Sequence, residues 1–198
     1  YDYRDRRGPI DALVLDSDLN LLERHPALVE PWHLSYPFVF EAGGEVYMLP
    51  EAFRSGRLTL YRARAFPWDW EPAARIDLDP APIDATPVWW EGRWWLFYTP
   101  ATTRFEKIAA LHLAWADRLE GPWTPHPLNP VLVDPSSARP GGRPFISGGQ
   151  IVLPVQDCSQ TYGGALRPLR VTRLDPEGFT AQAGPALAAP AAFAPFNR

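Results

Sequence analysis

Three carboxylate side chains stand beside predicted β-strands, where a fold that gathers them around one pit could use them for acid–base chemistry. Asp84 lies just ahead of the apolar strand that begins near Pro87, and Glu51 and Asp157 close the second strands of two other predicted hairpins. Cleavage of a glycosidic bond needs one carboxylic acid to protonate the leaving oxygen and one carboxylate as base or nucleophile. Each residue also has a structural alternative: Asp84 can cap a turn, and the other two can anchor loops.

Basic and aromatic side chains occupy the corresponding positions of the other hairpins. The first hairpin offers His33 and Tyr36, and the third offers Arg139 and Arg143. Arginines beside a pit would suit an anionic or polyhydroxylated ligand, since the guanidinium fork pairs with carboxylate or phosphate. The alternatives are salt bridges between sheets for the arginines and a packed position for His33. One or two tryptophans of a further cluster could stack on a sugar ring while the others form core: Trp89, Trp90, Trp94 and Trp95.

Composition excludes several other classes of function. The chain has 198 residues, of which 46% are apolar, and 19 basic and 23 acidic residues give a net charge of −4. This charge disfavours a broad nucleic-acid footprint, and no apolar run approaches the ~18–20 residues of a membrane span. Cys158 is the single cysteine, and the four histidines show no His-x-x-x-His spacing, so the sequence predicts no metal site. It contains no phosphate-binding loop and indicates no cofactor.

A repeated pattern of turns and apolar strands predicts the fold. The chain contains 24 prolines and nine tryptophans, a composition that disfavours long helices and favours β-structure with many turns. Three segments share a proline, a short apolar strand, a glycine turn and a second apolar strand, which is typical of a β-hairpin. They are 37–51, 87–98 and 144–157. A second unit, 58–72, aligns without gaps to 111–125, so that Trp70 matches Trp123.

Two more strands after each hairpin give four strands in about 50 residues, the size of a propeller blade. We therefore predict an all-β, five-bladed β-propeller-like fold that is incomplete, with about three and a half blades of antiparallel sheet. A β-sandwich is the alternative. Because residue 1 is Tyr1 and five blades need about 250 residues, we expect a fragment that forms one domain. Its predicted parts are the outer strands of a partial blade (1–30), three blades (31–82, 83–135 and 136–185) and a tail (186–198).

These segments resemble the N-terminal domain of plant glucosamine inositolphosphorylceramide transferase and its bacterial relatives, over nearly the whole chain. That domain is similar to the five-bladed propellers of family 43 and family 32 glycoside hydrolases. The motifs that carry the resemblance are His33-Leu-Ser-Tyr-Pro-Phe-Val-Phe-Glu41, Val46-Tyr-Met-Leu-Pro-Glu51, Ile83-Asp-Ala-Thr-Pro87, Gly92-Arg-Trp-Trp-Leu-Phe97, Gly121-Pro-Trp-Thr-Pro-His-Pro-Leu-Asn-Pro-Val131 and Gln156-Asp-Cys-Ser159.

The resemblance implies roles for some of these residues. The hydrolases take three carboxylates from the inner strands of successive blades, and Asp84 stands where one of them is expected. The other blades place His33, Tyr36, Arg139 and Arg143 at such positions, which departs from the hydrolase pattern. An Asp-Pro carboxylate is expected in a blade upstream of the chain. In the plant protein a separate C-terminal domain transfers the sugar, so a fused or partner glycosyltransferase domain is expected.

Two functions stay open at this point. The first is a carbohydrate-active domain that hydrolyses or recognises a sugar or glycolipid headgroup, with Asp84, Glu51 and Asp157 as catalytic candidates. The second is a non-catalytic glycan-binding or scaffolding propeller associated with a glycosyltransferase. A protein-interaction platform is a third alternative, since propellers host many functions. The sequence carries no visible targeting signal, so we expect a cytoplasmic location.

Overall fold

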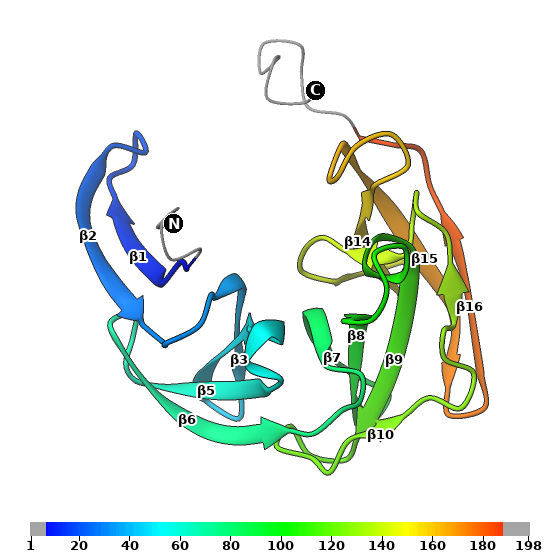
Figure 1. The fold of residues 1–198 in the computed structure, drawn as a ribbon, viewed down its shortest axis with the longest axis horizontal. Coiled ribbons are helices and arrows are strands. Elements are labelled where there is room, and N and C mark those ends of the chain that lie inside the picture. The colour runs from blue at the N-terminus through cyan, green and yellow to red at the C-terminus, as the bar shows by residue number, and fades with distance from the viewer. Residues whose placement is uncertain (1–6, 188–198) are drawn as a thin grey trace. The chain divides into compact units, whose positions relative to one another are not determined.

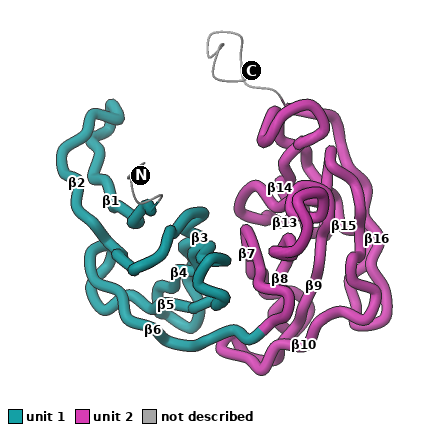
Figure 2. Tube along the Cα trace, viewed as in Figure 1, with its two compact units in different colours: residues 1–77 teal, residues 78–198 magenta. Residues whose placement is uncertain are grey.

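The computed structural model describes residues 7–187, which divide into two compact units: unit 1 runs to residue 77 and unit 2 begins at residue 78 (Figures 1 and 2). Nearly all of the regular structure is antiparallel β-sheet. The all-β prediction is therefore confirmed. The predicted tail, 186–198, lies almost entirely outside the described residues.

Unit 1 contains a two-stranded sheet and a four-stranded sheet. Its elements are β1 (Ile10–Leu15), β2 (Leu21–Leu28), β3 (Ser35–Ala42), β4 (Glu45–Glu51), the 3-10 turn η1 (Phe53–Ser55), β5 (Leu58–Ala65) and β6 (Asp69–Ile76). The larger sheet has the order β3-β4-β5-β6, so each strand pairs with its neighbour in the sequence.

Local turn chemistry closes both hairpins at the start of these sheets. Gly43 and Gly44 join β3 to β4 with φ values of +59° and +83°, a region that glycine enters without steric cost. Between β1 and β2, Asp16 Oδ1 accepts hydrogen bonds from the backbone N–H groups of Asp18 (2.9 Å) and Asn20 (2.8 Å). A short side chain thereby supplies the acceptor that the tight turn needs.

Unit 2 contains two sheets. Its elements are β7 (Pro82–Trp90), β8 (Arg93–Pro100), α1 (Glu106–Ala109), β9 (Ala110–Ala116), β10 (Thr124–Pro125), β11 (Leu132–Val133), β12 (Arg139–Pro140), β13 (Phe145–Ser147), β14 (Gln150–Asp157), β15 (Ala165–Asp175) and β16 (Gly178–Ala183). One sheet has the order β10-β9-β8-β7, with β11 also on β9, and the other has the order β12-β14-β15-β16, with β13 also on β14.

Each sheet of unit 2 is a four-stranded meander in which one outermost strand is split. β10 pairs with Trp115 and Ala114, whereas β11 pairs with Leu111 and Ala110 farther along β9. Asn129 fills the gap between them: its Oδ1 accepts from the Leu113 N–H and its Nδ2 donates to the Leu113 carbonyl, both at 2.8 Å. The side-chain amide thus replaces a backbone partner. In the other sheet, β12 and β13 likewise share one edge of β14.

The core of unit 2 joins its two sheets. Trp95, Phe97 and Leu113 of one sheet pack with Leu153 and Val155 of the other, and all are at most 1% exposed. Every residue of β8 from Trp95 onward is buried, which explains its uninterrupted apolar sequence.

The tryptophans singled out in the sequence divide between core and surface. Trp95 is buried, whereas Trp89 is 51% exposed and stands edge-on to Trp94, with ring centroids 5.5 Å apart. Trp90 and Trp94 are half-buried. Trp95 therefore forms part of the core, whereas Trp89 presents an exposed ring at the surface.

The variant Asn129→Ala tests the role of the amide that bridges β10 and β11. We expect the free energy of unfolding to fall by about 1–3 kcal/mol, because the buried N–H of Leu113 loses its acceptor, whereas the Leu113 C=O keeps the hydrogen bond from the His126 N–H. Urea denaturation followed by tryptophan fluorescence measures the change. The matched control is Asn20→Ala, which removes one exposed hydrogen bond to Asp16 and should change stability by about 0.5 kcal/mol or less. Equal losses in the two variants would contradict the bridging role.

Candidate functional site

Asp84 occupies a strained, buried position near the start of β7. The residue is 3% exposed and has a φ of +49°, and the pairing of β7 with β8 shifts register between Ile83 and Thr86. The Thr86 hydroxyl donates to the Asp84 carbonyl at 3.0 Å. A non-glycine residue with positive φ at a bulge costs free energy, and such bulges often re-aim a side chain beside a site. The backbone of β7 therefore directs Asp84 away from the ordinary alternation of the strand.

The same device occurs in β3 of unit 1. There the register shifts between Ser35 and Phe38, and Tyr36 has a φ of +44°. The position that matches Asp84 in that sheet is thus Tyr36, whose ring stacks on Phe38 with centroids 6.4 Å apart. Both residues were predicted as site residues, and the structure gives them a common backbone conformation.

Arg139 and Gln156 enclose the Asp84 carboxylate. Arg139 Nε donates to Asp84 Oδ2 at 2.7 Å, and the two side chains are only 7% and 4% exposed. Gln156 Nε2 donates to the same oxygen at 3.1 Å and to the Pro140 carbonyl at 2.8 Å. Arg139 Nη1 also donates to the Lys107 carbonyl. This buried, charge-assisted cluster joins β7 of one sheet to β12 and β14 of the other.

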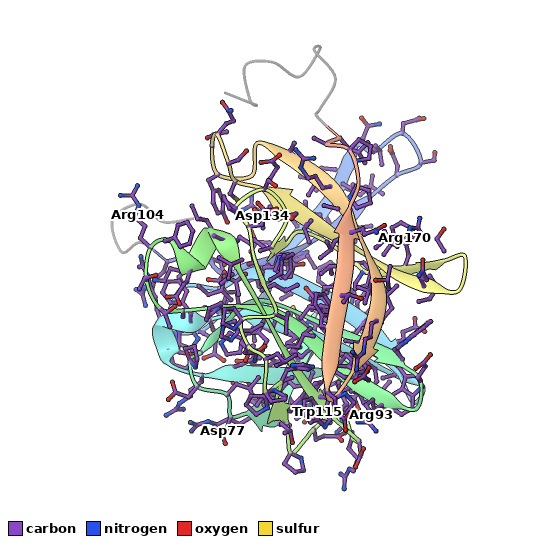
Figure 3. All side chains as sticks on the ribbon, turned by 90° about the vertical axis from the view of Figure 1, so that its right-hand side faces the viewer. Asp77, Arg93, Arg104, Trp115, Asp134 and Arg170 are labelled. Atoms are coloured by element: carbon purple, nitrogen blue, oxygen red, sulfur yellow. The ribbon has the colours of Figure 1, made fainter. Side chains whose placement is uncertain are left out.

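Two features of the chain place the arginine there. Arg139 stands directly opposite Gln156 in the β12–β14 ladder, so both side chains leave the same face. Before β12, Asp134 accepts hydrogen bonds from the backbone and hydroxyl of Ser136 and from the hydroxyl of Ser137. Burial alone would raise the pKa of Asp134, but these bonds outweigh it and lower the pKa. In Figure 3, Asp134 lies in the upper part of unit 2 and Trp115 lies in the lower part.

An exposed aromatic ring covers the arginine. The Arg139 guanidinium carbon lies 4.9 Å from the ring centroid of Tyr162, a cation–π distance. Tyr162 is 65% exposed, so its ring reaches solvent over a buried ion pair. Arg143, the other predicted arginine, is exposed in the segment between β12 and β13.

Asp157 has a separate set of partners. Its carboxylate accepts from the Ser159 N–H at 3.0 Å and from the Ser159 hydroxyl, and it forms an ion pair with Arg167 at 2.9 Å. The hydrogen bonds from Ser159 are the main reason that the pKa of Asp157 is lowered. Since Gln156 and Asp157 are adjacent in β14, their side chains leave opposite faces of the strand. These are the contacts of a carboxylate that anchors the β14–β15 loop.

Glu51 and His33 belong to unit 1. Glu51 is 7% exposed and stands opposite Ser35 at the end of the β3–β4 ladder. Burial, followed by the positive charge of Arg54, lowers the pKa of His33. The predicted pairing of Glu51 with Asp84, which belongs to unit 2, stays a prediction.

Among residues 7–187, no group of three or more histidine, cysteine, aspartate or glutamate side chains is placed to hold a metal ion. Cys158 is buried. In the same part of the chain, no helix is both long and apolar enough to span a membrane.

Sequence reasoning did not identify Gln156 and Tyr162. Gln156 opens the motif Gln156-Asp-Cys-Ser159, in which the acidic Asp157 is the stronger signal for acid–base chemistry. Tyr162 lies in a loop after β14, where no strand pattern fixes a side chain's direction. Tyr162 and Arg139 come close together only through the pairing of β12 with β14, which the sequence pattern does not show.

Comparison with solved structures relates this fold to a known architecture. A thermostable family-43 glycoside hydrolase superposes with a TM-score of 0.59 over 90% of this chain and 71% of that chain, at 16% sequence identity. At this identity the likeness shows the fold alone, which is similar to the five-bladed propellers of that family. This likeness confirms the propeller-like prediction, and the three larger sheets of residues 7–187 are the four-stranded meanders that such blades require.

Comparison with curated sequences relates the chain to a plant protein. Glucosamine inositolphosphorylceramide transferase 1 of Oryza sativa subsp. indica is 41% identical over 156 residues, which cover 77% of this chain and 21% of that protein. The Arabidopsis thaliana protein of the same name is 38% identical over 156 residues, covering 77% of this chain and 20% of its own length. The chain thus spans about a fifth of the length of these relatives. Residues 20–186 match the family model for the N-terminal region of glucosamine inositolphosphorylceramide transferase 1, and the chain belongs to this family.

Proposed function

We propose that this domain recognises a sugar or a glycolipid headgroup without hydrolysing it. The observation that carries the proposal is the engagement of Asp84. Its Oδ2 accepts from Arg139 at 2.7 Å and from Gln156 at 3.1 Å inside a buried cluster. A general acid has to offer a proton to the leaving oxygen of the substrate. Asp84 is also only 3% exposed, so its carboxylate is poorly placed to meet a substrate as base or nucleophile.

The surroundings of this cluster suit recognition of a polyhydroxylated ligand. Tyr162 offers an exposed ring with a hydroxyl group, and the guanidinium of Arg139 beneath it fixes the ring's position. Rigid aromatic rings with a polar tip bind sugars through one apolar face and one hydrogen bond. Arg143 is exposed close by in sequence and would pair with an anionic substituent.

The name of the relatives supports a choice of ligand class. It combines glucosamine with inositolphosphorylceramide, that is, an amino sugar and a phosphorylated polyol. We infer that this domain presents or orients such a headgroup for a glycosyltransferase domain, either fused or a partner. Hydrolysis is the second candidate, favoured by one observation: Asp84 is a buried acidic residue with positive φ in a fold similar to family-43 hydrolases.

A panel of 4-nitrophenyl glycosides separates the two candidates. We expect no release of nitrophenol above background from either the wild-type chain or Asp84→Asn. Turnover by the wild type that Asp84→Asn abolishes would overturn the proposal and establish hydrolysis.

Isothermal titration calorimetry with glucosamine and myo-inositol 1-phosphate tests recognition. We expect at least one of the two compounds to bind. Tyr162→Ala should weaken this binding by about fivefold to tenfold, equivalent to about 1–1.4 kcal/mol, because the exposed ring is lost. The matched control is Trp89→Ala, which removes another exposed aromatic of unit 2 and should leave affinity unchanged. Absence of heat with both compounds, or equal effects of the two variants, would count against the proposal.

The ion pair itself is tested by unfolding. We expect Arg139→Met to lower the free energy of unfolding by about 3–5 kcal/mol, because it leaves a buried carboxylate without its counter-ion. The double variant Asp84→Leu/Arg139→Met should lose less than the sum of the two single variants, since the double replacement leaves neither charge buried alone. Additive losses in the double-mutant cycle would show that the two charges are not coupled.

A further inference from the structure

One face of the β5–β6 hairpin in unit 1 carries a set of polar side chains outside the cluster described above. Arg57 immediately precedes β5, and Thr59 and Tyr61 follow at intervals of two, so the three share one face of the strand. Thr59 stands directly opposite Arg75, and Tyr61 stands opposite Pro72. Two arginines and two hydroxyl groups therefore gather on the same side of the hairpin.

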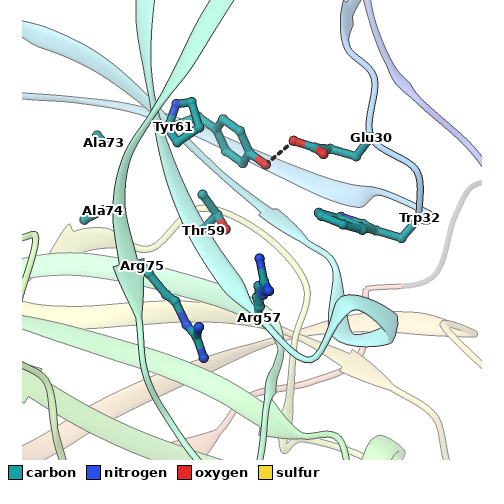
Figure 4. A pocket seen from close by; sticks show the side chains of 9 residues that line it. Glu30, Trp32, Arg57, Thr59, Tyr61, Ala73, Ala74 and Arg75 are labelled. Atoms are coloured by element: carbon teal, nitrogen blue, oxygen red, sulfur yellow. Dashed lines mark hydrogen bonds between the residues drawn. The ribbon is translucent and has the colours of Figure 1, made fainter.

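The segment after β2 closes this face into a groove of about 330 Å³. Glu30 and Trp32 lie across it from the hairpin, as Figure 4 shows. This volume is at the low end of the range of about 300–1,000 Å³ found for small-molecule sites. The groove therefore has room for a ligand of the size of one sugar ring.

Trp32 gives the groove an apolar wall and a hydrogen-bond donor. The ring is half-buried and packs against a core cluster that includes Leu34, Met48 and Tyr61. Its indole Nε1 is buried and has no hydrogen-bond acceptor among residues 7–187. Buried donors are nearly always satisfied in folded proteins. A ligand hydroxyl or carboxylate oxygen in the groove would supply the acceptor.

Glu30 supplies hydrogen-bond acceptors, and Tyr61 fixes the direction of its carboxylate. The Tyr61 hydroxyl donates to Glu30 Oε1 at 2.7 Å. Burial, reinforced by this contact with Glu30, raises the pKa of Tyr61 well above its usual value, so the hydroxyl keeps its proton. A carboxylate has about four lone-pair sites, and one bond from Tyr61 leaves room for sugar hydroxyl donors. The tyrosine thus fixes Glu30 in a direction that suits a polyol.

The two arginines supply the charge preference. Both are exposed at the rim, and Arg75 Nε forms an ion pair with Asp77, with side chains 57% and 73% exposed. An ion pair this exposed contributes little to stability, so Arg75 can turn to a bound anion at small cost. Guanidinium groups bind carboxylate and phosphate in a bidentate manner.

We propose that this groove binds an anionic saccharide: one sugar ring stacked on Trp32, with hydroxyls on Glu30 and a carboxylate or phosphate on Arg57 and Arg75. The proposal does not depend on the function proposed for Asp84 and Tyr162, because every residue of the groove belongs to unit 1.

Calorimetric titration of the full chain with glucose 6-phosphate and with glucuronate tests it, with glucose and inorganic phosphate as reference compounds. We expect at least one of the anionic sugars to bind at least tenfold more tightly than both references. The pair of sugars distinguishes a phosphate preference from a carboxylate preference. Binding of inorganic phosphate as tight as that of the sugar phosphate, or of glucose as tight as both anionic sugars, would overturn the proposal.

Variants of the two arginines then locate the binding. Arg75→Gln and Arg57→Gln should each weaken binding at least fivefold. The control is Arg64→Gln, which replaces an exposed arginine of β5 paired with Asp69 and should leave binding unchanged.

Variants of Trp32 test the wall of the groove. Trp32→Phe, which keeps an aromatic wall and loses the indole N–H, should weaken binding less than Trp32→Ala. If Trp32→Ala does not fold, as judged by circular dichroism, the exposed arginine variants carry the test. Loss of binding in Tyr162→Ala but not in Arg75→Gln would assign the sugar to unit 2 and contradict this inference.

Discussion

The buried ion pair between Asp84 and Arg139 is the constraint on which unit 2 depends. It joins two sheets that also share an apolar core and a hydrogen bond between His126 Nε2 and the Asp175 carbonyl. Removing two charges from water is expensive, and the cost is offset only if the remaining polar atoms are satisfied. Here Gln156 and the Lys107 carbonyl provide those additional bonds. The cluster therefore adds directional contacts to the apolar core that the two sheets share.

The same constraint shapes the chemistry that unit 2 can offer. A strained backbone at Asp84 normally accompanies a reactive group, yet here the strain directs the carboxylate to an arginine. The same backbone device presents Tyr36 in β3, so two sheets share the bulge and carry different side chains on it. Fold likeness to hydrolases does not decide the chemistry of the site, because function is decided by the residues of a site and not by the scaffold.

Much of the fold could be predicted because its signals are local. Glycine turns and apolar strands marked the hairpins, and the four-strand repeat followed from their spacing. The contact between Asp84 and Arg139 could not be predicted, since the residues are 55 positions apart and a salt bridge between sheets was only an alternative for Arg139. The match of Tyr36 with Asp84 depends on register shifts that move the pairing of each strand by one residue, whereas alignment of Pro37 with Pro87 would match Asp84 with Leu34. The groove at Trp32 was missed because one of its walls comes from a connecting segment without periodicity.

The split outer strands have a consequence for how the protein behaves in concentrated solution. An outermost strand with free N–H and C=O groups is a template for pairing with another chain. β10 is two residues long and includes Pro125, and β6, the last strand of its sheet, includes Pro72. Proline has no N–H to offer, and short or interrupted edges present few groups in register. The prolines that first indicated turns thus also make these two sheet edges poor templates for pairing with another chain.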